Sequence, residues 1–276
     1  MIKDVVLALG LESAADPARD YAISVSATFN AHIAAVGFVY DPMLPTVDMG
    51  GAVPFDIIDA QREANKKAAT DAIARFEEAA RRAGLSAESR TIDASFSGAA
   101  GVFGSIARSF DLAVVGQSNP ETTRDDLMIE GALFESGRPL LVVPYIQRTG
   151  LKLDRVTACW DGSRNAARAI NDAMPFLARA KAVDVVTVTG EKDNADAMQG
   201  VDIAQHLARH GLNVDVRQIT VGDLDVTNAI LSDAADHDTD FIVMGGYGHS
   251  RLREFVLGGA TRGILESMTV PAWMSH

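Results

Sequence analysis

The two halves of this sequence carry the same landmarks in the same order, and this internal repeat limits the fold more than any other feature. FDLAVVGQ at 110–117 pairs with TDFIVMGG at 239–246, and LSAESRTI at 85–92 pairs with LNVDVRQI at 212–219. Each half also closes with a short apolar run around a proline, at 138–145 and 269–276. We therefore expect two similar domains in tandem, residues 1–147 and 148–276, joined by a short linker near 146–153.

Within each half, apolar runs of strand length alternate with amphipathic helical patterns. This alternation predicts an α/β fold in which a parallel sheet carries helices on both faces. We expect two doubly wound domains, each with a five-stranded parallel sheet in the order 3-2-1-4-5. The pattern also predicts a helix from 165 to 180, and a helix from about 57 to 83 that follows a Pro- and Gly-rich segment at 41–55.

The composition excludes several classes of function. A net charge of −12 argues against nucleic acid and against an anionic membrane surface. Cys159 is the single cysteine, so neither an intramolecular disulfide nor a cysteine-based zinc site can form. The histidines are spread along the chain, and we expect no metal site. The amino-terminal apolar run is too short for a signal sequence or a membrane span, which favours a cytoplasmic protein.

Unusual residues follow the first and fourth strands of the second half. Open doubly wound sheets bind ligands beyond the carboxyl ends of the strands, where the strand order reverses. Asp161-Gly162-Ser163 follows the first strand, and GGYGHSRLREFVLGGATR at 245–262 follows the fourth. The sequence therefore predicts a ligand site between these two strand ends, although Asp161 could also be a turn or helix-capping residue.

The glycines of the second segment suit a polyphosphate. Gly245 and Gly248 permit positive φ angles and leave no Cβ in front of an anion. Gly258 and Gly259 precede ATRGILESM, a predicted helix whose amino terminus offers free N–H groups and a favourable dipole. Thr261 would add a hydroxyl donor. The alternative is a glycine-rich connection between a strand and a helix that binds no ligand.

Gly245-x2-Gly248-x9-Gly258 resembles the G-2x-G-9x-G-[S/T] motif of ATP-binding universal stress proteins, and the strand pattern resembles that family over essentially the whole chain. The resemblance implies an adenine nucleotide alpha hydrolase-like fold, with ATP as the ligand and Mg²⁺ as an optional companion. It assigns adenine and ribose contacts to Asp161 and Val188. Ribose and phosphate contacts would come from Met244, Gly245, Tyr247, Gly248, Gly258, Gly259, Ala260 and Thr261. Gly259 departs from the motif, because the family has Ser or Thr there, and this leaves affinity and nucleotide preference open.

The first half lacks the aspartate and the glycines of this predicted site. Leu11 aligns with Asp161, and Gly116 is followed by QSNPETTRDD, in which Pro120 and three carboxylates replace the glycines. Carboxylates repel phosphate and proline has no N–H group to donate. We expect no ATP in this half, which would serve as a packing partner within the chain or hold a different, less charged ligand. A homodimer is also open, because the strand around 271–275 could pair across chains.

Three functional classes compete. The leading one is a nucleotide-binding stress or regulatory protein with no catalytic residues, for which weak ATP hydrolysis is optional. No GxxxxGK[ST] motif follows the first strand, and the first strand-to-helix turns also lack the GxGxxG of nicotinamide-dependent oxidoreductases. The serious rival is an interaction module that works without a nucleotide.

Overall fold

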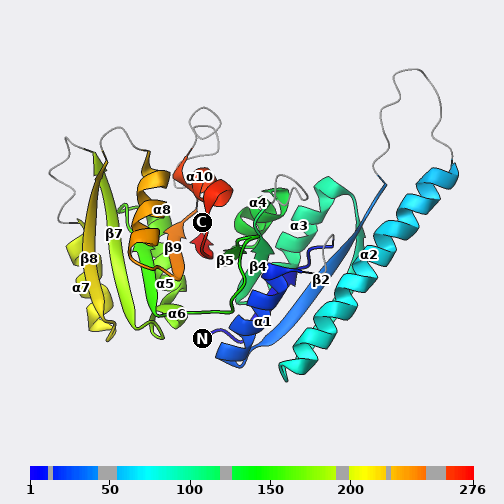
Figure 1. Ribbon diagram of the computed structural model, residues 1–276, viewed down its shortest axis with the longest axis horizontal. Coiled ribbons are helices and arrows are strands. Elements are labelled where there is room, and N and C mark those ends of the chain that lie inside the picture. Colours follow the sequence, from blue (N-terminus) through cyan, green and yellow to red (C-terminus); the bar gives the residue numbers. More distant parts are fainter. Residues whose placement is uncertain (12–14, 43–54, 119–125, 191–198, 222–224, 247–258) are drawn as a thin grey trace, which may run out of the picture.

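The structure is a computed structural model that describes residues 1–11, 15–42, 55–118, 126–190, 199–221, 225–246 and 259–276 (Figure 1). The elements of the first half are β1 (Asp4–Ala8), α1 (Pro17–Phe29), β2 (His32–Tyr40), α2 (Phe55–Arg82), β3 (Ala87–Ala94), α3 (Phe96–Ala107), β4 (Leu112–Gly116), α4 (Asp126–Glu135) and β5 (Leu140–Val143). Those of the second half are β6 (Arg155–Cys159), α5 (Arg164–Asp172), α6 (Met174–Leu177), β7 (Ala182–Gly190), α7 (Gln199–Arg209), β8 (Val214–Val221), α8 (Val226–Asp236), β9 (Phe241–Gly245), α10 (Ala260–Ser267) and β10 (Ala272–Ser275).

All strands of both halves lie in one sheet. Its ten strands run in the order β3-β2-β1-β4-β5-β10-β9-β6-β7-β8, and every neighbouring pair is parallel except β5 and β10. The α/β class and the mostly parallel sheet are thus confirmed. Two separate sheets were expected, but the halves meet edge to edge through an antiparallel pair in which Trp273 lies opposite Leu141. The strand around 271–275 therefore pairs within the chain, with β5, rather than at an open edge.

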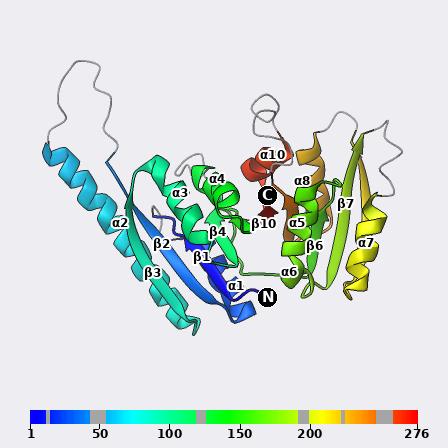
Figure 2. The same cartoon turned by 180° about the vertical axis from the view of Figure 1, so that it is seen from behind.

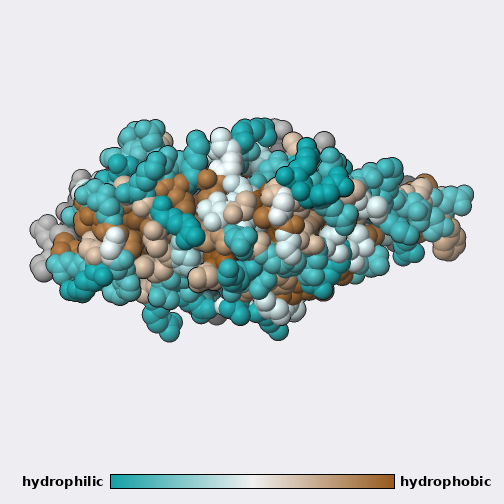
Figure 3. Space-filling model, turned by 90° about the horizontal axis from the view of Figure 1, so that it is seen from below, coloured by the Kyte–Doolittle hydropathy of each residue, from teal (hydrophilic) through white to brown (hydrophobic). Residues whose placement is uncertain are grey.

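Helices cover both faces of this sheet, as Figures 1 and 2 show from opposite sides. One face carries a core built with α1, α2, α5, α6 and α7. The opposite face carries a core built with α3, α4, α8 and α10. The underside of the elongated molecule shows patches of hydrophobic residues across its middle, with hydrophilic residues between and around them (Figure 3).

Local signals in the sequence explain where several helices begin. The side chain of Asp16 accepts a hydrogen bond from the Arg19 amide at the start of α1, and Ser163 does the same for α5. Such N-caps satisfy backbone N–H groups that have no partner within the helix. Pro17 occupies the first position of α1, where its missing N–H group costs nothing.

The predicted helix from 165 to 180 is two helices in the structure. The first, α5, ends at Asp172, and Pro175 lies in the first turn of the four-residue α6. A proline inside a continuous helix would remove a backbone hydrogen bond and clash with the preceding turn. The apolar spacing was identified correctly, but the prediction gave too little weight to this proline.

The two halves also meet through side chains. The rings of Phe29 and Phe176 have centroids 4.6 Å apart, and the Arg179 guanidinium lies 4.5 Å from the Phe29 centroid. In the linker, Gly150 packs so closely on α1 that an added Cβ would clash with the Ser24 hydroxyl. The halves therefore form one packed body, and the domain boundary at 147/148 stays a prediction.

Candidate functional site

The structure brings three of the predicted site positions to one edge of the sheet. β6 lies between β9 and β7, with Ala158 opposite Val243 and Cys159 opposite Val186. All three strands are parallel, so their carboxyl ends meet at the same edge. Val188 lies near the end of β7, two residues before its last residue, Gly190. Gly245 is the last residue of β9, and Asp161 follows the end of β6.

Asp161 is exposed and forms a turn. Its Oδ1 accepts a hydrogen bond of 2.9 Å from the Ser163 amide, and Gly162 between them has a φ of 73°. Ser163 in turn caps α5 by accepting a hydrogen bond from the Ala166 amide. Asp161 therefore has a structural role at the entry to α5, and its contact with a ligand stays a prediction.

Gly245 also has a structural role, because the first turn of α5 packs against it. A Cβ added at Gly245 would lie 2.6 Å from the Ala166 nitrogen and 2.8 Å from the Asn165 carbonyl carbon. Backbone atoms cannot move away as a flexible side chain can. The need for glycine here thus follows from packing alone, whether or not an anion binds nearby.

Other predicted residues lie on the sheet face that α8 and α10 cover. Met244 is buried in the core of this face, and Val188 packs against the same core. Gly259 is the N-cap of α10 and offers no capping side chain, while Ala260 is partly exposed and Thr261 is buried. Tyr247, Gly248 and Gly258 lie outside the described residues. The structure thus describes the flanks of the predicted phosphate loop.

The first half differs from the second at the matching edge. The register of β1 and β6 with their neighbours shows that Gly10, rather than Leu11 as predicted, takes the place of Asp161. Asp16 lies beside Gly10 and accepts hydrogen bonds from the Gly10 and Arg19 amides. Burial raises the pKa of the Asp16 carboxyl, and these hydrogen bonds partly oppose the shift. An acidic group thus sits at this edge.

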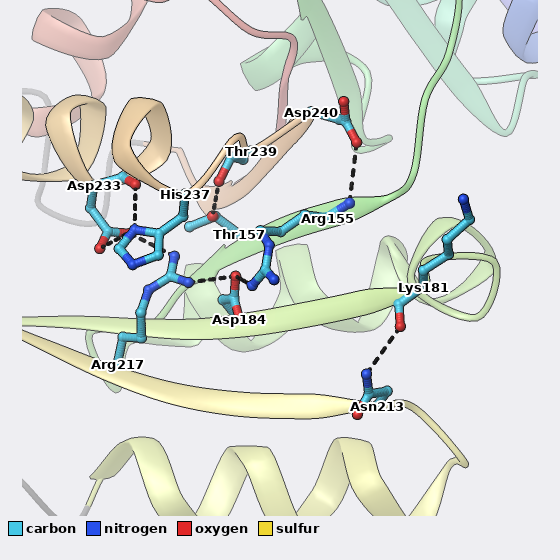
Figure 4. A network of polar contacts seen from close by, with 10 residues as sticks. All are labelled: Arg155, Thr157, Lys181, Asp184, Asn213, Arg217, Asp233, His237, Thr239 and Asp240. Carbon is cyan, nitrogen blue, oxygen red and sulfur yellow. Dashed lines mark hydrogen bonds and ion pairs between the residues drawn. The ribbon is translucent and has the colours of Figure 1, made fainter.

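The other prominent polar cluster lies between the sheet and α8, toward the amino ends of β6 and β7 (Figure 4). The Asp184 carboxylate is 1% exposed and accepts from Arg155 at 2.7 Å and from Arg217 at 2.6 Å. Arg217 also pairs with Asp233 at 2.7 Å, and His237 Nδ1 lies 2.8 Å from the Asp233 carbonyl oxygen. The charges of this cluster pair with one another, which indicates a structural role. Asp184 Oδ1 and Arg217 Nε are nevertheless buried without a hydrogen-bond partner among the described residues.

A histidine pair on α7 was not predicted, although the spacing in HLARH shows it. The rings of His206 and His210 are one helical turn apart, with centroids at 4.8 Å. Two imidazoles at this spacing can share a metal, but structural zinc sites use four protein ligands and catalytic sites three. Among the described residues, no group of three or more metal-binding side chains gathers, and the pair has no third ligand.

Cys159 is the last residue of β6, and we expect its thiol to be a poor nucleophile. Burial, and then the charges of Asp233 and Asp161, raise the pKa of the Cys159 thiol to about 12. A higher pKa lowers the fraction of thiolate at neutral pH, which slows the reaction. The thiolate that does form is more nucleophilic, but this offsets only part of the loss in rate. Labelling by a disulfide reagent should be slower than in the urea-unfolded chain by roughly 30- to 100-fold. Equal rates in the two states would contradict this prediction.

The chain is similar to known proteins mainly in its fold, and only weakly in its sequence. No family model matches the sequence. Universal stress protein Slr1230 of Synechocystis sp. is 27% identical over 140 residues, which cover 49% of this chain and 45% of that protein, so the match spans less than half its length. A universal stress protein structure from Archaeoglobus fulgidus is similar over 99% of this chain and 97% of its own, with a TM-score of 0.73 and 16% identity. A putative universal stress protein from Pseudomonas aeruginosa matches over 99% and 93%, with a TM-score of 0.60 and 14% identity.

These similarities define the class of the protein: an α/β chain with the fold of universal stress proteins. The expected resemblance to the universal stress protein family is confirmed. A universal stress protein in complex with cAMP also matches, but over 46% of this chain with a TM-score of 0.38, and this likeness carries no argument about a ligand here. Among the described residues, none of the helices is both long and apolar enough to cross a membrane.

Proposed function

We propose that the second half of the chain binds ATP or a related nucleotide, and that this binding has a regulatory rather than a catalytic role in the cytoplasm. The observation that carries the proposal is the meeting of Asp161, Gly245 and Val188 at one edge of the sheet, where the strand order reverses. α10 adds an amino terminus without a side-chain cap, and such a helix end attracts phosphate.

The electrostatics of the two halves also favour the second one. In the first half a buried carboxylate, Asp16, lies beside Gly10. In the second half the matching edge carries Asp161, which is exposed, so that water and salt screen its charge. A polyanion therefore meets less repulsion at the second edge than at the first.

Adding ATP should stabilise the wild-type protein. A ligand that binds only the folded state raises the free energy of unfolding by about 2.7 kcal/mol when its concentration is 100 times Kd. Thermal unfolding at increasing ATP concentrations measures this shift, and titration of a fluorescent ATP analogue gives the Kd directly. We expect Gly248→Val and Asp161→Ala to weaken binding.

Asp154→Ala provides the matched control, because this exposed aspartate lies at the other end of β6 and pairs with Lys181 on the surface. Its variant should bind the analogue as the wild type does. If the unmodified protein shows neither saturable binding nor a shift in melting temperature, the proposal is wrong.

The rival function is an interaction module that needs no nucleotide. Two observations favour it: Asp161 is engaged in a turn, and Gly245 is required by the packing of α5. Both residues thus have reasons to be present that involve no ligand. The absence of binding in the experiment above would select this alternative.

A further inference from the structure

A buried glutamine of the first half reaches into the second half. β4 pairs with β1 as β9 pairs with β6, so Gly116 at the end of β4 is equivalent to Gly245 at the end of β9. Gln117 is therefore equivalent to Gly246. Gln117 is 3% exposed, and its amide donates a hydrogen bond of 2.8 Å to the Val143 carbonyl. A long polar side chain therefore stands in the first half where the second half has a glycine.

Both ends of the Gln117 carboxamide are engaged. Its Nε2 donates to the carbonyl oxygens of Leu265 at 2.8 Å and Glu266 at 3.3 Å, and its Oε1 accepts from the Tyr145 amide at 3.3 Å. Leu265 and Glu266 belong to the last turn of α10, where carbonyl groups have no partner within the helix. Gln117 thus ties the carboxyl end of α10 to the residues that follow β5.

The first half makes a second contact on the other flank of segment 247–258. A Cβ added at Gly246 would lie 2.8 Å from Leu133 Cδ2, and Leu133 belongs to α4 and is 2% exposed. Gly246 comes directly before the segment, and α10 begins just after it. The first half therefore contacts the chain before segment 247–258, at Gly246, and after it, at the carboxyl end of α10.

We propose that the first half positions the nucleotide site of the second half, with Gln117 and Leu133 as the positioning residues. This inference rests on the proposed function. Gln117 holds the carboxyl end of α10, so it sets the direction in which the amino terminus of this short helix points. That amino terminus is the part of the site expected to meet phosphate, and neither positioning residue touches the nucleotide. The first half is then more than a packing partner.

The first experiment compares Gln117→Met with the wild type in binding ATP and adenosine. Methionine has a similar length but cannot donate, so the two carbonyl groups of α10 lose their tie. We expect ATP binding to weaken about tenfold, the effect of one well-placed hydrogen bond, while adenosine binding changes by less than about twofold. A general loss of folding would weaken both ligands, so this split separates positioning from a merely structural role. Gln147→Met is the control, because the side chain of Gln147 donates to Thr149 within the linker.

A second pair of variants tests the other flank. Gly246→Ala crowds Leu133 and should weaken ATP binding by about tenfold, and adding Leu133→Ala should restore it by making room. Equal ATP affinity in wild type, Gln117→Met and Gly246→Ala would overturn the inference and leave nucleotide binding intact. An equal loss of ATP and adenosine affinity, or a failure of Leu133→Ala to restore binding, would also overturn it. A wild-type protein that binds neither ligand would instead refute the proposed function, and the inference with it.

Discussion

Replacing Asp184 with alanine should lower the free energy of unfolding by about 3 kcal/mol, because it leaves two arginines without their shared partner. Removing one member of a buried ion pair costs roughly 3–5 kcal/mol, since the remaining charge has lost its water and its counter-charge. We expect the low end of this range. Arg155 and Arg217 are 37% and 18% exposed, so water can reach part of the freed charge.

Urea unfolding followed by circular dichroism measures this change. Asp154→Ala is a suitable control, because it removes an exposed aspartate from the same half and should leave the unfolding midpoint within experimental error. If Asp184→Ala and Asp154→Ala unfold at the same urea concentration as the wild type, the cluster contributes little to stability. The equivalent position in the first half is Ala34, buried in an apolar core, so the fold itself does not require an ion there.

Replacing Trp273 with alanine should lower the free energy of unfolding by about 4 kcal/mol, within the range for large core residues. Trp273 is fully buried in β10, packs on Phe176 with ring centroids 4.9 Å apart, and lies opposite Leu141 of the first half. The cavity would open at the junction of the two halves. We therefore also expect their unfolding to become less cooperative.

The variant retains Trp160, whose fluorescence reports on the second half, while circular dichroism reports on both. In the wild type the two signals should change together, and in Trp273→Ala they should separate. Val216→Ala, an exposed position on β8, should change stability by about 0.5 kcal/mol or less. If fluorescence and circular dichroism of Trp273→Ala still change together, at nearly the wild-type midpoint, the packing of Trp273 is not critical for cooperative unfolding.

Much of the fold could be predicted because the repeat and the short apolar runs are properties of local sequence. The strands at 112–116 and 241–246 were identified as matching short apolar runs in the two halves, and both lie in the interior of the sheet. The union of the two sheets could not be predicted, because short apolar strands such as β5 and β10 look alike whether they form an edge or pair with each other. Only the tertiary arrangement decides between these states.

The candidate site shows the same division. The glycines and Asp161 stood out in the sequence, and the strand ends that carry them do meet. Sequence alone did not reveal that α5 packs on Gly245, because the approach of one backbone to another has no local signal. Asp184 was not singled out in the sequence, and its partners Arg155 and Arg217 lie on neighbouring strands, so that their meeting depends on strand register.

The antiparallel pairing of β5 with β10 has a consequence for how such a molecule can change over evolutionary time. A partner supplied by the same polypeptide is always present in equal amount and at a high effective concentration, however dilute the protein becomes. No second copy must be matched, so a substitution on one side alters only that side. Freed from the demands of symmetry, the two sides could diverge, one gaining Gln117 where the other has Gly246.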